Sequence, residues 1–220
     1  MLMNIGTYTR LLGAKCGTWL DVYGLDDDSL EGIPPPVVAV ILLFPVPEQY
    51  DEYCKEQSEL VKERSSDLPI PTDIFFLKQL VGNACGTVGI IHALSNNTTE
   101  LEMEDGILKE FITATSGMTP EERGLALADS KVAQVHENIA EEGQTAPPDR
   151  EIPHLPHFVA FVHKHGYLYE LDGKIIGPLN HGPTTPENLL KDAAKVCKSR
   201  VARDPTNLRC TLIALTTAPV

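Results

Sequence analysis

The sequence predicts an α/β fold in which a central, mostly antiparallel sheet lies between layers of helices. The apolar, β-branched run Val37–Phe44 is bounded by prolines and is typical of a central strand buried on both faces. Two more strand patterns, Phe158–Val162 and Tyr167–Leu171, flank a turn at 164–166 and predict an antiparallel hairpin. Leu208–Leu215 has the pattern of a closing strand.

Five segments have the composition and spacing of helices. They are Glu48–Ser66, Asn83–Ser95, Met103–Thr115, Thr119–Asn138 and Thr185–Arg203. The fourth begins with Thr-Pro-Glu-Glu, a capping box with proline at the first helical position. The segment Gly143–Pro156 differs, because it holds four prolines and few apolar residues. We expect an exposed loop there.

Composition limits the classes of partner. The chain has 220 residues, of which 42% are apolar, and this suits a single domain spanning residues 1–220. Its 31 acidic and 18 basic residues give a formal charge of -13. Such a surface repels phosphate backbones and anionic lipids, so we expect no nucleic-acid or membrane partner. A basic protein or basic peptide tail is the better electrostatic match.

The cysteines indicate a reducing compartment. There are five, they are scattered, and no CxxC pair occurs, so the sequence predicts neither a zinc site nor a disulfide framework. The longest apolar run is too short to span a bilayer, and the first residues lack the pattern of a signal peptide. We therefore expect a cytoplasmic protein, monomeric and without a cofactor or metal.

One cysteine has the setting of a nucleophile. Asn83 is a good helix N-cap, which places Cys85 in the first turn, where free backbone N–H groups favour a thiolate. Gly86 keeps bulk away from the sulfur. The Gln79 amide and the Cys85 N–H could form an oxyanion hole, worth roughly 3–4 kcal/mol per donor. Taken alone, this spacing leaves catalysis the minority interpretation, because most helical cysteines only fill space.

A thiol nucleophile needs an imidazole base and a group that orients it. If Lys164 and His165 form a two-residue loop, His157 and Asp172 lie directly opposite each other on one face of the hairpin. A three-residue loop would shift this pairing by one position. We expect His92 to be a core residue. His181 could be a turn residue or could support the site, and we favour the turn. The remaining histidines are expected to be solvated or to lie on a charged helix or in the loop: His136, His154, His163 and His165.

The stretch around Cys85 resembles the active-site signature of the ubiquitin carboxyl-terminal hydrolases. The motif is Gln79-x-x-x-Asn-Ala-Cys-Gly, followed by Ile-His-Ala-Leu-Ser at 91–95. Matching segments extend along nearly the whole chain: Leu25-Asp26, Leu42–Pro45, Glu142–Gln144, His157-Phe158, Leu168–Gly173, Asn180–Gly182 and Lys191–Cys197. A long ordered set is far more specific than a single motif. The resemblance implies a papain-like α+β core with a knotted backbone.

Carried over position by position, the resemblance implies Cys85 as nucleophile, His157 as general base and acid, Asp172 as its orienter and Gln79 as oxyanion stabiliser. It also implies a crossover loop at about Ile139–Pro156, which limits the size of the leaving group. Residues beside the site and in this loop are expected to contact substrate: Asn83, Gly86, Pro156, Gly143 and Gln144.

The implied activity is thiol-dependent cleavage of adducts from the C-terminal glycine of ubiquitin. Ubiquitin's basic, glycine-terminated tail suits the acidic chain, and two glycines can enter a groove that larger side chains would block. An alternative is a ubiquitin-holding protein with little turnover, because the stretch up to Leu20 matches the family loosely. A redox-sensing thiol domain is a weaker alternative, since no resolving cysteine lies near Cys85 in the sequence.

Overall fold

The computed structural model describes residues 5–64, 70–82, 84–135, 156–203 and 210–219. Six strands form one sheet in the order β1-β6-β2-β3-β4-β5, and every neighbouring pair is antiparallel. The strands are β1 (Thr18–Val22), β2 (Val37–Pro45), β3 (Pro156–Lys164), β4 (Tyr167–Leu171), β5 (Leu179–Pro183) and β6 (Thr211–Thr216). The predicted antiparallel sheet is confirmed.

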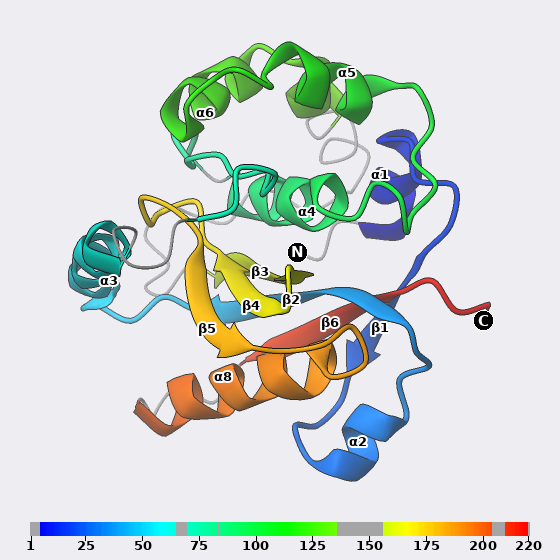
Figure 1. Ribbon diagram of the computed structural model, residues 1–220, viewed down its shortest axis with the longest axis vertical. Coiled ribbons are helices and arrows are strands. Elements are labelled where there is room, and N and C mark those ends of the chain that lie inside the picture. The colour runs from blue at the N-terminus through cyan, green and yellow to red at the C-terminus, as the bar shows by residue number, and fades with distance from the viewer. Residues whose placement is uncertain (1–4, 65–69, 83, 136–155, 204–209, 220) are drawn as a thin grey trace.

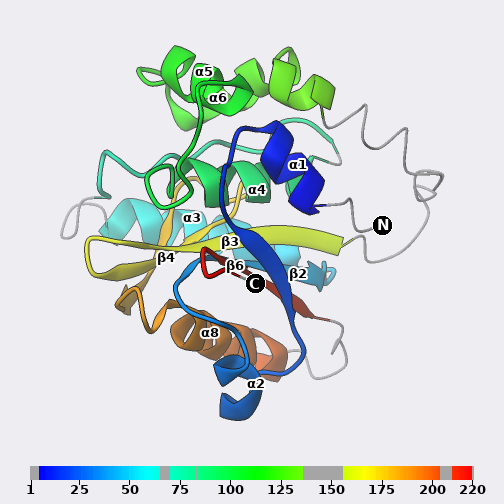
Figure 2. The same cartoon turned by 90° about the vertical axis from the view of Figure 1, so that its right-hand side faces the viewer.

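Helices cover both faces of this sheet (Figures 1 and 2). They are α1 (Ile5–Leu11), α2 (Asp27–Glu31), α3 (Tyr50–Arg64), α4 (Cys85–Ser95), α5 (Ile107–Ala114), α6 (Pro120–Ala128) and α8 (Leu189–Arg203). Helices α1 and α4 lie on one face, with α5 and α6 beyond α4, while α2 and α8 lie on the other face and α3 flanks the sheet. Within the described ranges, no helix is long and apolar enough to cross a membrane.

Strand β2 forms the centre of the core, as its apolar run predicted. It lies between β6 and β3, and alternate side chains enter the two hydrophobic clusters on opposite faces. Ile41 belongs to the cluster under α4, and Leu42 to the cluster against α8; both are fully buried. Each such side chain stabilises the fold by roughly 1.5–3 kcal/mol. This rigid strand supports β3, the strand that carries His157.

Two predicted helices are shorter than expected. The capping box at Thr119 is present, with its hydroxyl accepting from the Glu122 N–H and the Glu122 carboxylate accepting from the Thr119 N–H. The predicted helix to Asn138 is interrupted, because α6 ends at Ala128 and helical residues resume at 131–135; residues 136–138 lie outside the described residues. The Ser130 hydroxyl accepts from the N–H three residues later, which starts a new turn. Likewise, α5 begins only after Gly106.

The β3–β4 turn differs from the prediction. Lys164 pairs with Tyr167, so the two-residue loop consists of His165 and Gly166 instead of Lys164 and His165. Both loop residues have positive φ, 49° and 83°. A two-residue hairpin turn of this type requires positive φ at both central positions, and glycine adopts it without cost. The register is therefore displaced by two positions from the expected one.

The C-terminal elements agree with the sequence pattern apart from their ends. Helix α8 begins at Leu189, four residues after the predicted start, and the Thr184 hydroxyl donates to the Asp192 carboxylate at 2.6 Å in its first turn. The closing strand β6 is confirmed at Thr211–Thr216, while residues 208–209 of the predicted strand lie outside the described residues. The knot implied by the family stays a prediction.

Candidate active site

Cys85 is the first residue of α4, so the predicted placement in the first turn is confirmed. The N-cap is Ala84, which makes no side-chain cap hydrogen bond, and the predicted cap Asn83 lies outside the described residues. The N–H groups at the start of a helix have no intrahelical partner and are available as donors. The thiol is partly exposed, and its Sγ donates weakly to the Pro156 carbonyl at 3.7 Å.

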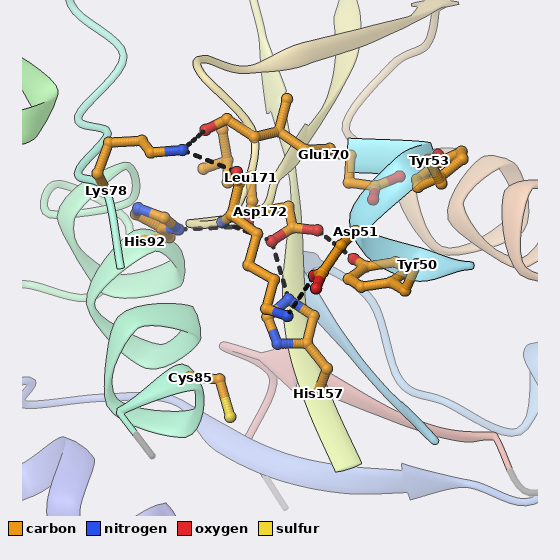
Figure 3. Close-up of polar contacts among 12 residues, drawn as sticks. Tyr50, Asp51, Tyr53, Lys78, Cys85, His92, His157, Glu170, Leu171 and Asp172 are labelled. Carbon is orange, nitrogen blue, oxygen red and sulfur yellow. Dashed lines mark hydrogen bonds and ion pairs between the residues drawn. The ribbon is translucent and has the colours of Figure 1, made fainter. Parts of the chain in front are cut away.

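His157 and Asp172 form a buried pair across from this cysteine (Figure 3). The imidazole Nε2–H donates to Asp172 Oδ1 at 2.8 Å, with the side chains 3% and 0% exposed. The same Oδ1 accepts the Lys174 N–H at 2.9 Å, and Oδ2 accepts the Tyr50 hydroxyl. Since Nε2 is occupied, Nδ1 is the ring nitrogen left to face the sulfur.

The pair meets although the predicted register was wrong. Continuing the observed pairing of Ala160 with Leu171 places Asp172 level with position 159, two residues from His157. An offset of two keeps both side chains on one face of the sheet, because side chains alternate with period two. The contact is therefore diagonal, between neighbours that long side chains can bridge.

The surroundings of His157 and Asp172 favour the charged form of each side chain, the imidazolium and the carboxylate. Burial lowers the pKa of His157, but hydrogen bonds to Asp172 and Cys85 outweigh burial and raise that pKa to about 9. Burial raises the pKa of Asp172, and the hydrogen bonds and charge of its partners reverse this to leave it below its usual value. The raised pKa favours the imidazolium form of His157, which can donate a proton.

Gln79 is tied by its backbone to the loop that carries Asp172. Its N–H donates to the Gly173 carbonyl at 2.9 Å. The adjacent Lys78 ammonium donates to the carbonyls of Lys174 and Ile175 at 2.7 and 3.0 Å. The Gln79 side-chain Oε1 is buried and has no hydrogen-bond partner among the described residues. The backbone contact thus holds Gln79 beside the loop of Asp172, while the oxygen of its side-chain amide makes no hydrogen bond to the described residues.

Helix α4 lies directly on β3 through two glycines. A Cβ placed on Gly86 would lie 3.6 Å from the Phe158 ring, and one placed on Gly89 would lie 3.4 Å from the Phe158 Cβ. The Phe158 side chain therefore packs between the start of the helix and the strand that carries His157. This close packing brings the nucleophile and the imidazole together.

His92 is a core residue, as predicted. Its Nε2 accepts the Leu77 N–H at 3.1 Å, and Nδ1 donates to the Leu171 carbonyl at 3.3 Å. The ring stacks on Phe76 with centroids 5.0 Å apart. Complete burial lowers the pKa of His92 to about 4, so the imidazole is neutral at physiological pH.

The prediction that His181 is a turn residue was wrong. His181 lies in β5, and its Nε2 bonds the Glu170 carboxylate at 2.8 Å. The other Glu170 oxygen accepts from Arg200 at 2.6 Å, and Glu170 is fully buried. The strand was missed because it is short and contains glycine and proline, which are depleted in strands.

The structure describes two of the remaining residues that were predicted to contact substrate. Pro156 is the exposed first residue of β3, immediately before His157, and Gly86 is in the first turn of α4. Gly143 and Gln144 lie outside the described residues. Tyr50, whose hydroxyl bonds Asp172, was not predicted from the sequence, because in an amphipathic helix it reads as an ordinary core residue.

A helix-start cysteine beside a carboxylate-bonded histidine, carried by this fold, defines a cysteine protease. A model of the ubiquitin carboxyl-terminal hydrolase family 1 matches residues 5–202. The chain therefore belongs to the ubiquitin carboxyl-terminal hydrolase family.

Curated relatives of this chain are also ubiquitin carboxyl-terminal hydrolases. A ubiquitin carboxyl-terminal hydrolase of Drosophila melanogaster is 48% identical over 199 residues, covering 90% of this chain and 86% of the relative. The human ubiquitin carboxyl-terminal hydrolase isozyme L1 is 39% identical over 203 residues, covering 90% and 88%. In fold, the chain resembles the UCH37 catalytic domain of Trichinella spiralis bound to ubiquitin vinyl methyl ester, with a TM-score of 0.73, 24% identity and coverage of 99% and 94%.

Proposed function

We propose that this chain is a thiol-dependent hydrolase that releases small adducts or short peptides from the C-terminal glycine of ubiquitin. The observation that carries the proposal is the buried His157–Asp172 pair, 2.8 Å apart, beside Cys85 at the start of α4. The names of the curated relatives support the reaction. The Trichinella domain, which is bound to a ubiquitin vinyl methyl ester, supports ubiquitin as the substrate.

The acylation step uses three side chains. The Cys85 thiolate attacks the carbonyl carbon of the terminal glycine, and the His157 imidazolium is the proton source for the leaving amine through Nδ1. Asp172 holds the ring in the required tautomer through Nε2. The products are the free amine and a thioester between Cys85 and ubiquitin.

Deacylation reverses the proton transfer. His157, now neutral, removes a proton from water, which attacks the thioester carbonyl, and the sulfur leaves as the thiolate. In both steps the carbonyl oxygen gains negative charge. The Gln79 side-chain amide and the Cys85 backbone N–H are the proposed donors to that oxygen, each worth roughly 3–4 kcal/mol by analogy with other oxyanion holes.

Substrate approach is proposed to involve the residues on either side of the nucleophile and the loop that ends at Pro156. The Pro156 carbonyl lies 3.7 Å from Cys85 Sγ, so the first residue of β3 lies at the site. We propose that Asn83, Gly86 and the loop residues Gly143 and Gln144 contact the substrate tail. The loop then forms part of one catalytic domain spanning residues 1–220.

The charge of the chain supports a basic partner, and its cysteines support a cytoplasmic location. A formal charge of -13 favours a basic partner such as the ubiquitin tail. All five cysteines are free thiols, which supports a cytoplasmic location, since reducing compartments keep thiols reduced.

The test is hydrolysis of ubiquitin carrying a fluorescent amide at its C-terminus. The native protein is compared with Cys85→Ala, and Cys16→Ala is a matched control. Cys16 is also a partly exposed thiol, and it donates to the Glu100 carbonyl at 3.3 Å. We expect release by the native protein and by Cys16→Ala, and none by Cys85→Ala.

Two other outcomes would contradict the proposal. Equal release by the native protein and Cys85→Ala would exclude this thiol as the nucleophile. Absence of release by the native protein, with tight ubiquitin binding retained in both, would indicate a ubiquitin-holding protein.

A further inference from the structure

Tyr50, the first residue of α3, also contacts the site, although it is not one of the four residues proposed above to take part in the reaction. It is 3% exposed, and its hydroxyl donates to Asp172 Oδ2. The other carboxylate oxygen accepts both the His157 Nε2–H and the Lys174 N–H, at 2.8 and 2.9 Å. The hydroxyl therefore fixes the one oxygen that the histidine does not use, and with it the rotation of the carboxylate.

The ring of Tyr50 also forms part of the wall beside the imidazole (Figure 3). Its centroid lies 5.4 Å from that of His157, at an interplanar angle of 59°. Phe44 packs edge-on against it at 5.3 Å, and Tyr53 stacks on it at 5.7 Å. The Lys174 ammonium lies 5.4 Å from the ring centroid. With aromatic neighbours on several sides, the hydroxyl has little freedom to leave Asp172.

We propose that Tyr50 is a positioning residue for the reaction, holding Asp172 so that its Oδ1 keeps the His157 ring aligned toward Cys85. The inference rests on the proposed function, in which His157 transfers the proton. Without the hydroxyl, Oδ2 would be a buried charged oxygen with one partner fewer, and the carboxylate could rotate away from Nε2. A hydrogen bond to a charged group is among the stronger ones in proteins.

The discriminating variant is Tyr50→Phe, which keeps the ring and removes only the hydroxyl. The matched control is Tyr169→Phe on β4, another buried tyrosine, whose hydroxyl accepts from Asn180 at 3.4 Å and which belongs to the opposite hydrophobic cluster. With the ubiquitin amide substrate, we expect kcat of Tyr50→Phe to fall about tenfold while KM stays the same. The control should keep the native kcat.

A second readout does not depend on turnover. In the proton NMR spectrum, the His157 Nε2–H, bonded to a carboxylate, should give a far-downfield resonance in the native protein and in Tyr169→Phe. That resonance should move upfield in Tyr50→Phe. The native protein should also show a Tyr50 hydroxyl proton with a cross-peak to the His157 ring, which can be observed even if a variant fails to fold.

An unchanged kcat and an unchanged Nε2–H resonance in Tyr50→Phe would overturn the inference, as would a native spectrum without the hydroxyl cross-peak. Failure of the proposed function has a different signature, because native protein and Cys85→Ala would then be equally active or equally inactive. The NMR comparison decides on Tyr50 in either case.

Discussion

His92 makes the stability of this fold sensitive to acid. Its pKa is about 4 in the folded state against an ordinary value of 6.5, because the ring is wholly buried. Above pH 6.5 both the folded and unfolded chains hold this group neutral, and its contribution to stability is complete. As the pH falls from 6.5 toward 4, the unfolded chain binds a proton that the folded chain does not, so the free energy of unfolding decreases.

The size of this loss follows from the two pKa values. One pKa unit corresponds to about 1.4 kcal/mol, so the full gap between 6.5 and about 4 corresponds to about 3.5 kcal/mol. Most of it, about 2.5 kcal/mol, is lost between pH 7 and pH 4.5. That is a large part of the 5–15 kcal/mol that is typical of a whole domain.

Urea unfolding at pH 7 and pH 4.5 tests this by comparing the native protein with His92→Gln. Glutamine can place an acceptor near the position of Nε2, where the Leu77 N–H needs one, and it does not titrate. The other titrating groups are shared, so their effects cancel in the difference between the two proteins. We expect the native protein to lose about 2.5 kcal/mol more than the variant between these pH values. Equal losses would refute the assignment of the acid sensitivity to His92.

The remaining predictions concern the site and its support. Asp172→Asn should fold normally and lower turnover of the ubiquitin amide at least about a hundredfold, because it removes the charge that stabilises the His157 imidazolium; native kcat in this variant would remove Asp172 from the mechanism. Gly124→Ala would place a Cβ 2.2 Å from the Lys78 carbonyl oxygen, so we expect it to destabilise the fold by about 1–3 kcal/mol, seen as a lower Tm. Gly117→Ala, whose Cβ would meet no atom within 4 Å, is the control, and equal Tm values for the two variants would contradict this argument.

Much of the fold could be predicted because burial leaves a local pattern. A strand with both faces covered must be continuously apolar, and Val37–Phe44 could therefore be placed at the centre of the sheet. The pairing of His157 with Asp172 was also accessible, since it depends on which face of a hairpin each residue occupies. The exact turn was not, because the choice between loops at Lys164-His165 and His165-Gly166 depends on backbone torsions that several sequences satisfy.

The contacts that support the site leave no such pattern. Tyr50 meets Asp172 across 122 positions of sequence, and nothing in the spacing of an amphipathic helix identifies the partner of one hydroxyl. His181 likewise meets Glu170 only because β5 pairs with β4. The N-cap at Ala84 could not be predicted, because helix ends are ambiguous by a residue or two and Asn83 has the stronger capping propensity.

The packing of α4 on β3 has a consequence for how this site can be tuned. Gly86 and Gly89 contribute no side chains, so Phe158 packs closely against the helix at these two positions. Phe158 is the neighbour of His157 in β3, so its ring links the packing of the helix to the strand that carries the imidazole. We expect a change in the size of this side chain to alter the packing of the first turn of α4, and with it the position of Cys85 relative to His157.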